Sequence, residues 1–400
     1  MMRVVDFLYF GSLTNAAVGP VKNMKILRKN NLFFKKSKYD INFFDNKGLY
    51  VDDTYDVEID VNINRSQAKK YLANLSCSFL GTSLLFYIYF LRHAKAMINN
   101  YLKLDRRPDI IYMRDIFSAY YITKEDKFND IPKVLALANN GDGLKMLFDN
   151  FPKLNFIEKF LRKKEAYIYE NVSSIVLLSN NAKEVFKHTY NDKYLDKIDV
   201  SYNGLDDFEY SFKKERKVKT KLSFVTTGSI CKRKGHDLIV KAVGNLPKDK
   251  RKLFQIYFLG DGDLTISLKK MCTEMDLNDV IIFNGQTKDV NRILCESDFY
   301  IQVSRDEGMP MALIEALRAG LPSIGTKVAA IPEMIVNNKN GFLIDNESVI
   351  ELSSSILKML SLSKVEKKKF SVYSRKIFEE RFLLTRTMER LINIFDKVKH

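Results

Sequence analysis

The stretch DEGMPMALIEALRAG, residues 306–320, decides the fold of the C-terminal half of the chain. Pro310 suits the first position of a helix, because its missing N–H group would have no partner there and its fixed φ is already helical. Gly320, followed by a Leu-Pro pair, is a typical helix end. The stretch therefore predicts a helix that begins near Pro310 and ends at Gly320, with Glu307 in the loop before it.

Two glutamates lie near the amino end of this helix. Glu307 precedes it, and Glu315 lies about one and a half turns inside it, among apolar residues. An unpaired buried carboxylate would be costly, so we expect Glu315 to face a cavity or a buried partner. The amides around Gly308, Met309 and Met311 form the positive end of the helix dipole, which favours a phosphate. An ordinary amphipathic helix with a capping glutamate is the alternative.

A second motif lies upstream, where LSFVTTGS at residues 222–229 predicts a β-strand that ends in a Gly-Ser turn. The basic loop ICKRKGHD at 230–237 follows, and apolar residues at helical spacing come after it. Arg233 suits a diphosphate through paired hydrogen bonds, and Lys234 suits it as a point charge. A solvated run of charge is the plainer interpretation in so basic a chain, and only the rest of the pattern argues against it.

Together, the motifs of the chain resemble those of family 4 of the retaining glycosyltransferases, which have the two-domain GT-B fold. They follow the family's order along most of the sequence. The matching segments are PDIIY at 108–112, VLLS at 176–179, SYNGLD at 201–206, the loop of Gly228 with RKG at 233–235, FLGDG at 258–262, FNG at 283–285, residues 307–315, AIPE at 330–333 and NGFL at 340–343.

The resemblance implies an α/β protein of two Rossmann-like, doubly wound parallel-sheet domains that face each other across a cleft. The length agrees, because 400 residues exceed what one core usually holds. We expect an N-terminal acceptor-binding domain over residues 1–205 and a C-terminal donor-binding domain over 206–379, with a charged linker at 213–219. In the family the last helix crosses back to the first domain, and residues 380–400 are placed for that role.

The resemblance also implies the roles of the site residues. Arg233 and Lys234 match the positions that stabilise the departing diphosphate, Glu307 would bind hydroxyls of the transferred sugar, and Glu315 would bind the ribose. The residues expected to bind substrate around them, the last two from an N-terminal loop, are Gly228, Ser229, Asn284, Gly285, Gln286, Gly308, Met309, Pro310, Met311, Asn15 and Gly19.

Two positions depart from the family pattern. Many members carry a histidine after the strand that corresponds to residues 134–137, and here the run continues with Asn139 and Asn140. Either asparagine takes over the contacts of that histidine, and we include Asn140 among the binding residues, or the reacting centre is weakened. Ser229 stands where many relatives carry an arginine that faces the diphosphate, and Arg233 would compensate for it.

Composition narrows the class of protein. An apolar content of 46% with 28% charged residues is typical of a globular chain. The four cysteines form no CxxC pair and the four histidines are dispersed, so we expect neither a metal nor a disulfide framework, and the chain suits a reducing compartment. Asp6 interrupts the apolar start of the chain, which favours a first β-strand over a signal peptide.

Two further stretches concern membranes. Residues 75–91 carry no charge but are short and partly polar, so a buried helix is expected and not a membrane span. The net charge is +16, and between Asp6 and Asp40 there are seven basic residues and no acid. Mixed with Phe33 and Phe34, taken as exposed, these residues predict contact with an anionic membrane, against the alternative of a solvated helix face. No nucleic-acid motif supports a nucleic-acid partner.

The expected function is retaining transfer of a hexose or N-acetylhexosamine from a nucleotide-diphosphate sugar, with uridine the expected base. The acceptor would be a glycan, a lipid or a protein in bacterial surface-polymer synthesis, at the inner face of the cell membrane or elsewhere in the cytoplasm. The resemblance implies no cofactor, no metal and no protein nucleophile. A non-catalytic subunit of the same fold, which binds the acceptor and stabilises a partner transferase, is the alternative.

Overall fold

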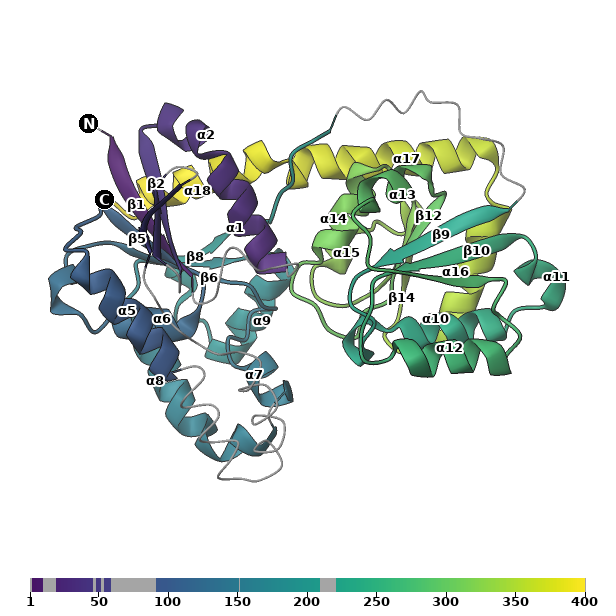
Figure 1. The fold of residues 1–400 in the computed structure, drawn as a ribbon, viewed down its shortest axis with the longest axis horizontal. Helices are drawn as coiled ribbons and strands as arrows, with labels where there is room; N and C mark the ends of the chain where they lie inside the picture. Colours follow the sequence, from purple (N-terminus) through teal and green to yellow (C-terminus); the bar gives the residue numbers. More distant parts are fainter. Residues whose placement is uncertain are drawn as a thin grey trace. The chain divides into compact units, whose positions relative to one another are not determined.

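The computed structural model describes residues 2–9, 19–45, 48–51, 54–58, 91–150, 152–208 and 221–399. The chain divides into two compact units (Figure 1). The first contains Met1–Tyr202 and Thr387–His400, and the second contains Asn203–Arg386. Asn15, the linker at 213–219 and nearly all of the uncharged stretch at 75–91 lie outside the described residues. In the part of the chain that is described, no helix has the length and apolarity needed to cross a bilayer.

The first unit is built on an eight-stranded sheet with the order β4-β3-β2-β1-β5-β6-β7-β8. Strand β3 pairs antiparallel with both β2 and β4, and the other pairs are parallel. The strands are β1 (Arg3–Leu8), β2 (Tyr39–Asp45), β3 (Gly48–Val51), β4 (Thr54–Glu58), β5 (Ile110–Met113), β6 (Lys133–Leu137), β7 (Ser174–Leu177) and β8 (Ile198–Val200).

The helices of the first unit connect and cover these strands. They are α1 (Gly19–Lys29), α2 (Asn31–Lys36), α5 (His93–Lys103), α6 (Ile116–Ile122), α7 (Lys145–Asn150), α8 (Glu158–Glu170) and α9 (Asn180–Tyr190), together with most of α18 (Leu384–Lys397). The buried face of α18 carries Met388, Leu391 and Phe395 at helical spacing. The ring of Phe395 packs against those of Phe7, Tyr39 and Tyr112, which explains why the end of the chain belongs to the first unit.

One expectation about the basic N-terminal stretch is wrong. Phe34 is not exposed but fully buried, because α2 packs against β2. The side chain of Asn31 fixes this packing through hydrogen bonds with both the N–H and the C=O of Ile41. Among the described residues of this stretch, the apolar side chain of Leu32 is exposed, at 66%.

The second unit is built on a six-stranded parallel sheet with the order β11-β10-β9-β12-β13-β14. Its strands are β9 (Leu222–Thr227), β10 (Phe254–Leu259), β11 (Ile281–Gly285), β12 (Phe299–Gln302), β13 (Ser323–Thr326) and β14 (Gly341–Ile344). The strand order reverses between β9 and β12. Ligands of doubly wound sheets bind at such a switch point, outside the carboxyl ends of the strands.

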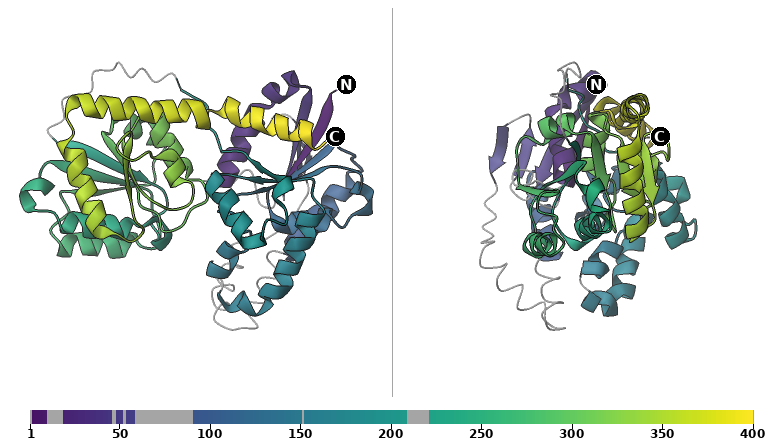
Figure 2. Two further views of the ribbon diagram at one scale, coloured as in Figure 1. Left: turned by 180° about the vertical axis from the view of Figure 1, so that it is seen from behind. Right: turned by 90° about the vertical axis from the view of Figure 1, so that its right-hand side faces the viewer.

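Helices cover both faces of this sheet, and α10 contacts α12 and α16 while α14 contacts α13 and α17. Figure 2 shows the strands of the second unit between these two layers. The helices are α10 (His236–Gly244), α11 (Lys248–Arg251), α12 (Thr265–Glu274), α13 (Val290–Glu296), α14 (Met311–Arg318), α15 (Ile331–Met334), α16 (Val349–Ser361) and α17 (Lys364–Ile377). The predicted α/β class, with two doubly wound and mainly parallel sheets, is confirmed.

The helix predicted from residues 306–320 is α14. Pro310 is its N-cap, with an extended backbone, and not its first helical residue. Its carbonyl accepts the amide of Leu313, so proline still begins the helix. Gly320 adopts a left-handed φ of 71° just after the helix, as expected of a helix-ending glycine.

Candidate active site

Two loops meet at the switch point of the second sheet. One follows β9 and carries Arg233 and Lys234, and the other follows β12 and carries Glu307. Gly235 allows them to pack closely, since it has a φ of 70° and a Cβ there would lie 2.0 Å from the carbonyl oxygen of Val303. The sheet topology therefore brings together residues that are 73 positions apart in the sequence.

Glu307 is the centre of the resulting cluster. Its carboxylate forms an ion pair with the ammonium group of Lys234 through Oε1, and with Arg233 through Oε2, 3.0 Å from Nη1. The Ser304 hydroxyl donates to the same Oε1 over 2.9 Å. Glu307 is buried and Lys234 nearly so, whereas the Arg233 side chain is 44% exposed. The guanidinium group is thus the member of the cluster that solvent or a ligand reaches most easily.

The charge state of Glu307 follows from this environment. Burial alone would raise the pKa of the carboxyl group, but Lys234 and Arg233 outweigh burial and hold the pKa below its usual range. Glu307 is therefore ionised at neutral pH. Two cations share one carboxylate, which leaves the cluster with an excess positive charge.

A line of polar side chains supports Glu307 from β12. Gln302 donates to the Ser304 hydroxyl over 2.7 Å, and Tyr300 donates to Gln302 over 2.9 Å. The Tyr300 and Thr227 hydroxyls lie 3.2 Å apart. Tyr300 and Gln302 share one face of β12 because side chains alternate along a strand, and Ser304 follows just after its end. These supporting side chains were not predicted from the sequence, although the alternation of FYIQVS at 299–304 indicates them.

Arg305 links the loop after β9 to the loop after β12. Its guanidinium binds Asp237 through two contacts of 2.7 and 2.8 Å, donates to the Lys232 carbonyl over 2.6 Å and pairs with Glu347. Its backbone amide donates to the Arg233 carbonyl over 2.8 Å. No local pattern in the sequence indicates this role, because Asp237 and Glu347 lie 68 and 42 positions away.

Glu315 lies in the same region of the second unit. It is buried in α14. Burial is the main cause of the raised pKa of Tyr300, and the charges of Glu315 and Glu307 raise this pKa further. Both carboxylates therefore lie near the Tyr300 phenol. At the start of α14, within the described residues, the amides of Gly308 and Met309 donate no hydrogen bond. Met309 and Met311 are both buried.

The other predicted residues of the second unit lie at the ends of neighbouring strands. Gly228 follows β9 with a φ of 131°, and a Cβ there would come within 3.7 Å of Lys234 Cε, while Ser229 is exposed. Gly285 ends the edge strand β11, and Asn284 and Gln286 beside it are exposed. No contact joins these last three residues to the Glu307 cluster in the described part of the chain.

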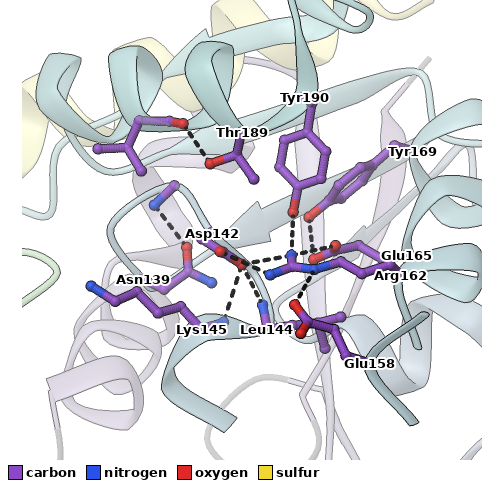
Figure 3. A network of polar contacts seen from close by, with 12 residues as sticks. Asn139, Asp142, Leu144, Lys145, Glu158, Arg162, Glu165, Tyr169, Thr189 and Tyr190 are labelled. Atoms are coloured by element: carbon purple, nitrogen blue, oxygen red, sulfur yellow. Dashed lines mark hydrogen bonds and ion pairs between the residues drawn. The ribbon is translucent and has the colours of Figure 1, made fainter. Parts of the chain in front are cut away.

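In the first unit, the loop after β6 is held by the polar network shown in Figure 3. Arg162 binds Asp142 through two contacts of 2.7 and 2.9 Å, Glu165 over 2.9 Å and the Tyr190 hydroxyl over 3.0 Å. Burial raises the pKa of Glu165, and Arg162 opposes that effect. Asp142 in turn accepts the amides of Leu144 and Lys145 at the start of α7.

This network fixes the loop that carries the two asparagines. The side-chain oxygen Oδ1 of Asn139 accepts the Gly141 amide over 3.0 Å, so this oxygen has a partner within the loop. The side-chain oxygen Oδ1 of Asn140 is buried and finds no partner among the described residues. Of the two candidates, Asn140 has the acceptor available for a substrate. Gly19 is the first residue of α1.

The described residues contain no group of three or more His, Cys, Asp or Glu side chains with the geometry to hold a metal ion. Metal independence stays a prediction.

Comparisons with known proteins agree with this architecture. Residues 207–377, almost all of the second unit, match the family of glycosyl transferases group 1. The amylovoran biosynthesis glycosyltransferase AmsK of Erwinia amylovora is 27% identical over 172 residues, which are 41% of this chain and 42% of that protein. An uncharacterized glycosyltransferase of Methanocaldococcus jannaschii is 26% identical over 242 residues, 58% and 60% of the two chains. The chain thus spans about half the length of these relatives.

A solved structure extends the likeness to the whole chain. Alr3699/HepE of Anabaena, in complex with UDP and glucose, superposes with a TM-score of 0.69 at 15% identity, over 99% of this chain and 100% of that one. At this identity the likeness shows the fold alone. Over residues 207–377 the chain matches the group 1 glycosyltransferases, and over its whole length it has the GT-B fold of such enzymes.

Proposed function

We propose that this protein is a retaining glycosyltransferase of family 4, which transfers a hexose or an N-acetylhexosamine from a UDP-sugar to a glycan, lipid-linked or protein acceptor. The product would be a bacterial surface polysaccharide or glycoconjugate. The observation that carries the proposal is the meeting of Arg233, Lys234 and Glu307 at the switch point of the second sheet. The relative named for amylovoran biosynthesis and the neighbour bound to UDP and glucose support it.

The excess positive charge of the cluster suits a nucleoside diphosphate. When the bond between the sugar carbon and the leaving phosphate breaks, negative charge grows on the phosphate while the ring becomes oxocarbenium-like. Lys234 and Arg233 stabilise that charge in a partly buried site, where electrostatic interactions are stronger than in water. They supply the positive charge that a divalent cation supplies in other transferases, so the proposed reaction needs no metal and no other cofactor.

Glu307 has two tasks in this proposal. Before the donor binds, it holds both cations in place, so little reorganisation is needed when the diphosphate arrives. Its ionised oxygens then accept hydrogen bonds from hydroxyls of the transferred sugar. The amides of Gly308 and Met309 bind the distal phosphate, and Glu315 binds the ribose hydroxyls.

Retention follows when the acceptor hydroxyl attacks from the side that the diphosphate leaves. The departing phosphate oxygen takes the proton of that hydroxyl, so no protein nucleophile forms a covalent intermediate. In the first unit, the side-chain oxygen Oδ1 of Asn140, buried and without a partner among the described residues, would accept a hydroxyl of the reacting sugar.

The experiment is incubation with UDP-glucose and UDP-N-acetylglucosamine in the presence of a crude acceptor extract, with release of UDP as the readout. Lys234→Ala should lower kcat by about 100-fold to 1,000-fold, as loss of one preorganised donor at a developing charge does. Lys232→Ala is the matched control, since Lys232 is exposed in the same loop. Equal rates for Lys234→Ala and the wild type would contradict the proposed role.

The absence of the family's histidine after β6 keeps the second candidate, a non-catalytic subunit. That protein would bind acceptor without consuming any nucleotide sugar. Wild-type protein that releases no UDP but raises the activity of a co-purified transferase would favour this candidate over the enzyme.

We also propose contact with the anionic inner face of the cell membrane. The support is the excess of basic residues between positions 7 and 39, of which Lys29, Lys36 and Lys38 are exposed, together with the exposed Leu32. Sedimentation with vesicles of anionic lipid should fall with added salt and in a Lys29→Glu/Lys36→Glu variant. Sedimentation that is indifferent to lipid charge would end this proposal.

A further inference from the structure

The first sheet has a switch point of its own, and a buried arginine lies there. The strand order reverses at β1, which pairs with β2 on one side and with β5 on the other. Arg114 directly follows β5, and its amide donates to the Leu8 carbonyl at the end of β1 over 3.3 Å. Arg114 therefore lies at the carboxyl edge of this sheet, where doubly wound domains bind their ligands.

The guanidinium group of Arg114 has unused donors. Arg114 is 6% exposed, and Nη1 donates to the side-chain oxygen Oδ1 of Asn23 over 3.0 Å. Nε and Nη2 are buried and form no hydrogen bond with the described residues, and the same holds for Nδ2 of Asn23. The buried phenol of Tyr112 lies near the guanidinium group, which opposes the rise in the pKa of Tyr112 that burial causes. Three buried donors thus gather beside a side chain that keeps its positive charge. A buried charge without such partners is costly, so a ligand is the expected source of the missing acceptors.

Other arginines of the chain show which ligand fits. Arg106 uses its Nε and Nη2 to bind the two carboxylate oxygens of Asp6, each over 3.0 Å. Arg305 uses the same two nitrogens on Glu347. This edge of a guanidinium group matches two oxygens held in one plane, as in a carboxylate or on one face of a phosphate. In Arg114 this edge binds no carboxylate of the residues that the structure describes.

Nearby carboxylates do not fill this position. Burial is the main cause of the raised pKa of the Tyr9 phenol. Asp45 and Asp115 lie close enough to Tyr9 to raise that pKa further, and Arg114 opposes the rise. The Asp115 carboxylate accepts the Ser118 amide over 2.7 Å and caps α6. Neither carboxylate accepts a hydrogen bond from Nε or Nη2 of Arg114.

We propose that the Nε–Nη2 edge of Arg114, with the side-chain amide of Asn23, binds an oxyanion carried by the acceptor. A phosphate and a carboxylate share the chemistry that this edge recognises. The assignment to the acceptor rests on the proposed function, in which the donor diphosphate belongs to Arg233 and Lys234 of the second unit. The oxyanion site itself rests on the first unit alone.

The test is calorimetric titration of the full chain with inorganic phosphate and with glucuronate, in the presence of saturating UDP so that the second unit is occupied. The wild type should bind one of the two anions, which identifies the oxyanion as phosphate or carboxylate. Arg114→Gln should weaken that binding at least tenfold. Arg107→Gln is the matched control, because Arg107 is exposed and paired with Asp130, and should bind as the wild type does.

A second variant covers the case in which Arg114→Gln does not fold. Asn23→Asp keeps Arg114 and places a carboxylate beside it, so this variant should fold with a melting temperature no lower than that of the wild type. Its affinity for the anion should still fall at least tenfold. Unchanged anion binding in Asn23→Asp, or no binding of either anion by the wild type, would overturn the site. Weaker UDP binding in Arg114→Gln but not in Arg107→Gln would overturn the assignment to the acceptor.

The two proposals fail separately. If UDP does not bind the wild type, the proposed function fails, and the anion titration is then repeated on an Arg233→Ala/Lys234→Ala variant without UDP. If the Arg233→Ala/Lys234→Ala variant binds the anion and the further substitution Asn23→Asp abolishes that binding, the site in the first unit is still supported.

Discussion

Glu307→Gln separates the structural from the catalytic work of the Glu307 cluster. The substitution keeps the size of the side chain but removes its charge and replaces one acceptor oxygen by an NH2 donor, so Lys234 and Arg233 lose their shared counter-ion. Removing one partner of a buried ion pair costs about 3–5 kcal/mol. Because the Arg233 side chain is 44% exposed and solvent can compensate it, we expect about 2–4 kcal/mol at pH 7.

The pH dependence of this difference has a definite sign. The pKa of Glu307 is held below its usual value in the folded protein. Its charge therefore stabilises the fold above the pKa of the unfolded chain, about 4.3, and that contribution is lost as the pH falls through the lower, folded-state pKa. The gap in unfolding free energy between wild type and Glu307→Gln should be full at pH 7 and should shrink below about pH 4.

The assay is urea denaturation followed by circular dichroism between pH 3 and pH 7, with hydrogen exchange of the peptide 299–310 to assign the loss to the second unit. Glu274→Gln is the control, because Glu274 is exposed and 3.8 Å from Lys270, and it should show no measurable change. The reasoning is refuted if Glu307→Gln is as stable as the wild type at pH 7, or if its deficit is as large at pH 3.

Three further substitutions test other parts of the structure. Arg305→Gln should break the link between the loops and lower kcat/KM by about 10-fold to 100-fold through misplacement of Lys234, while the exposed Arg292→Gln should not. Burial lowers the pKa of His236 to about 4, so protonation of this histidine favours the unfolded chain below pH 6.5. His236 packs on Phe258, and in denaturant titrations His236→Phe should be more stable than the wild type by about 2 kcal/mol at pH 5. This advantage should disappear above pH 7. Arg162→Met leaves Glu165 buried without its cation and should lower the free energy of unfolding by about 3 kcal/mol, as measured in urea.

Features that depend on a few neighbouring residues could be predicted from the sequence, whereas the partners of most site side chains could not. The Gly-Ser turn after β9 and the proline and glycine around α14 act within a few residues, so composition and spacing predicted both loops of the second unit. The support of Glu307 from Tyr300 and Gln302 depends on which face of β12 points toward the site. That direction is set by the neighbouring strands, which the sequence does not specify.

Phe34 illustrates the same limit in the first unit. The sequence places it among lysines, which predicts exposure, yet α2 turns this ring onto β2. The partners of Arg305 and Arg114 come from other elements, and the unused donors of Arg114 become visible only when every neighbouring acceptor has been assigned.

The claim that Arg233 and Lys234 bind a diphosphate is tested most directly by the affinities of UDP and UMP for the wild type and for Lys234→Ala. The two nucleotides differ only in the distal phosphate, so the cycle isolates the coupling between that phosphate and the lysine. The account predicts that the wild type prefers UDP by at least about tenfold, or 1.4 kcal/mol, and that Lys234→Ala loses this preference while it binds UMP as before. Equal affinities of the wild type for UDP and UMP would contradict this account, and so would an equal loss of affinity for both nucleotides in Lys234→Ala.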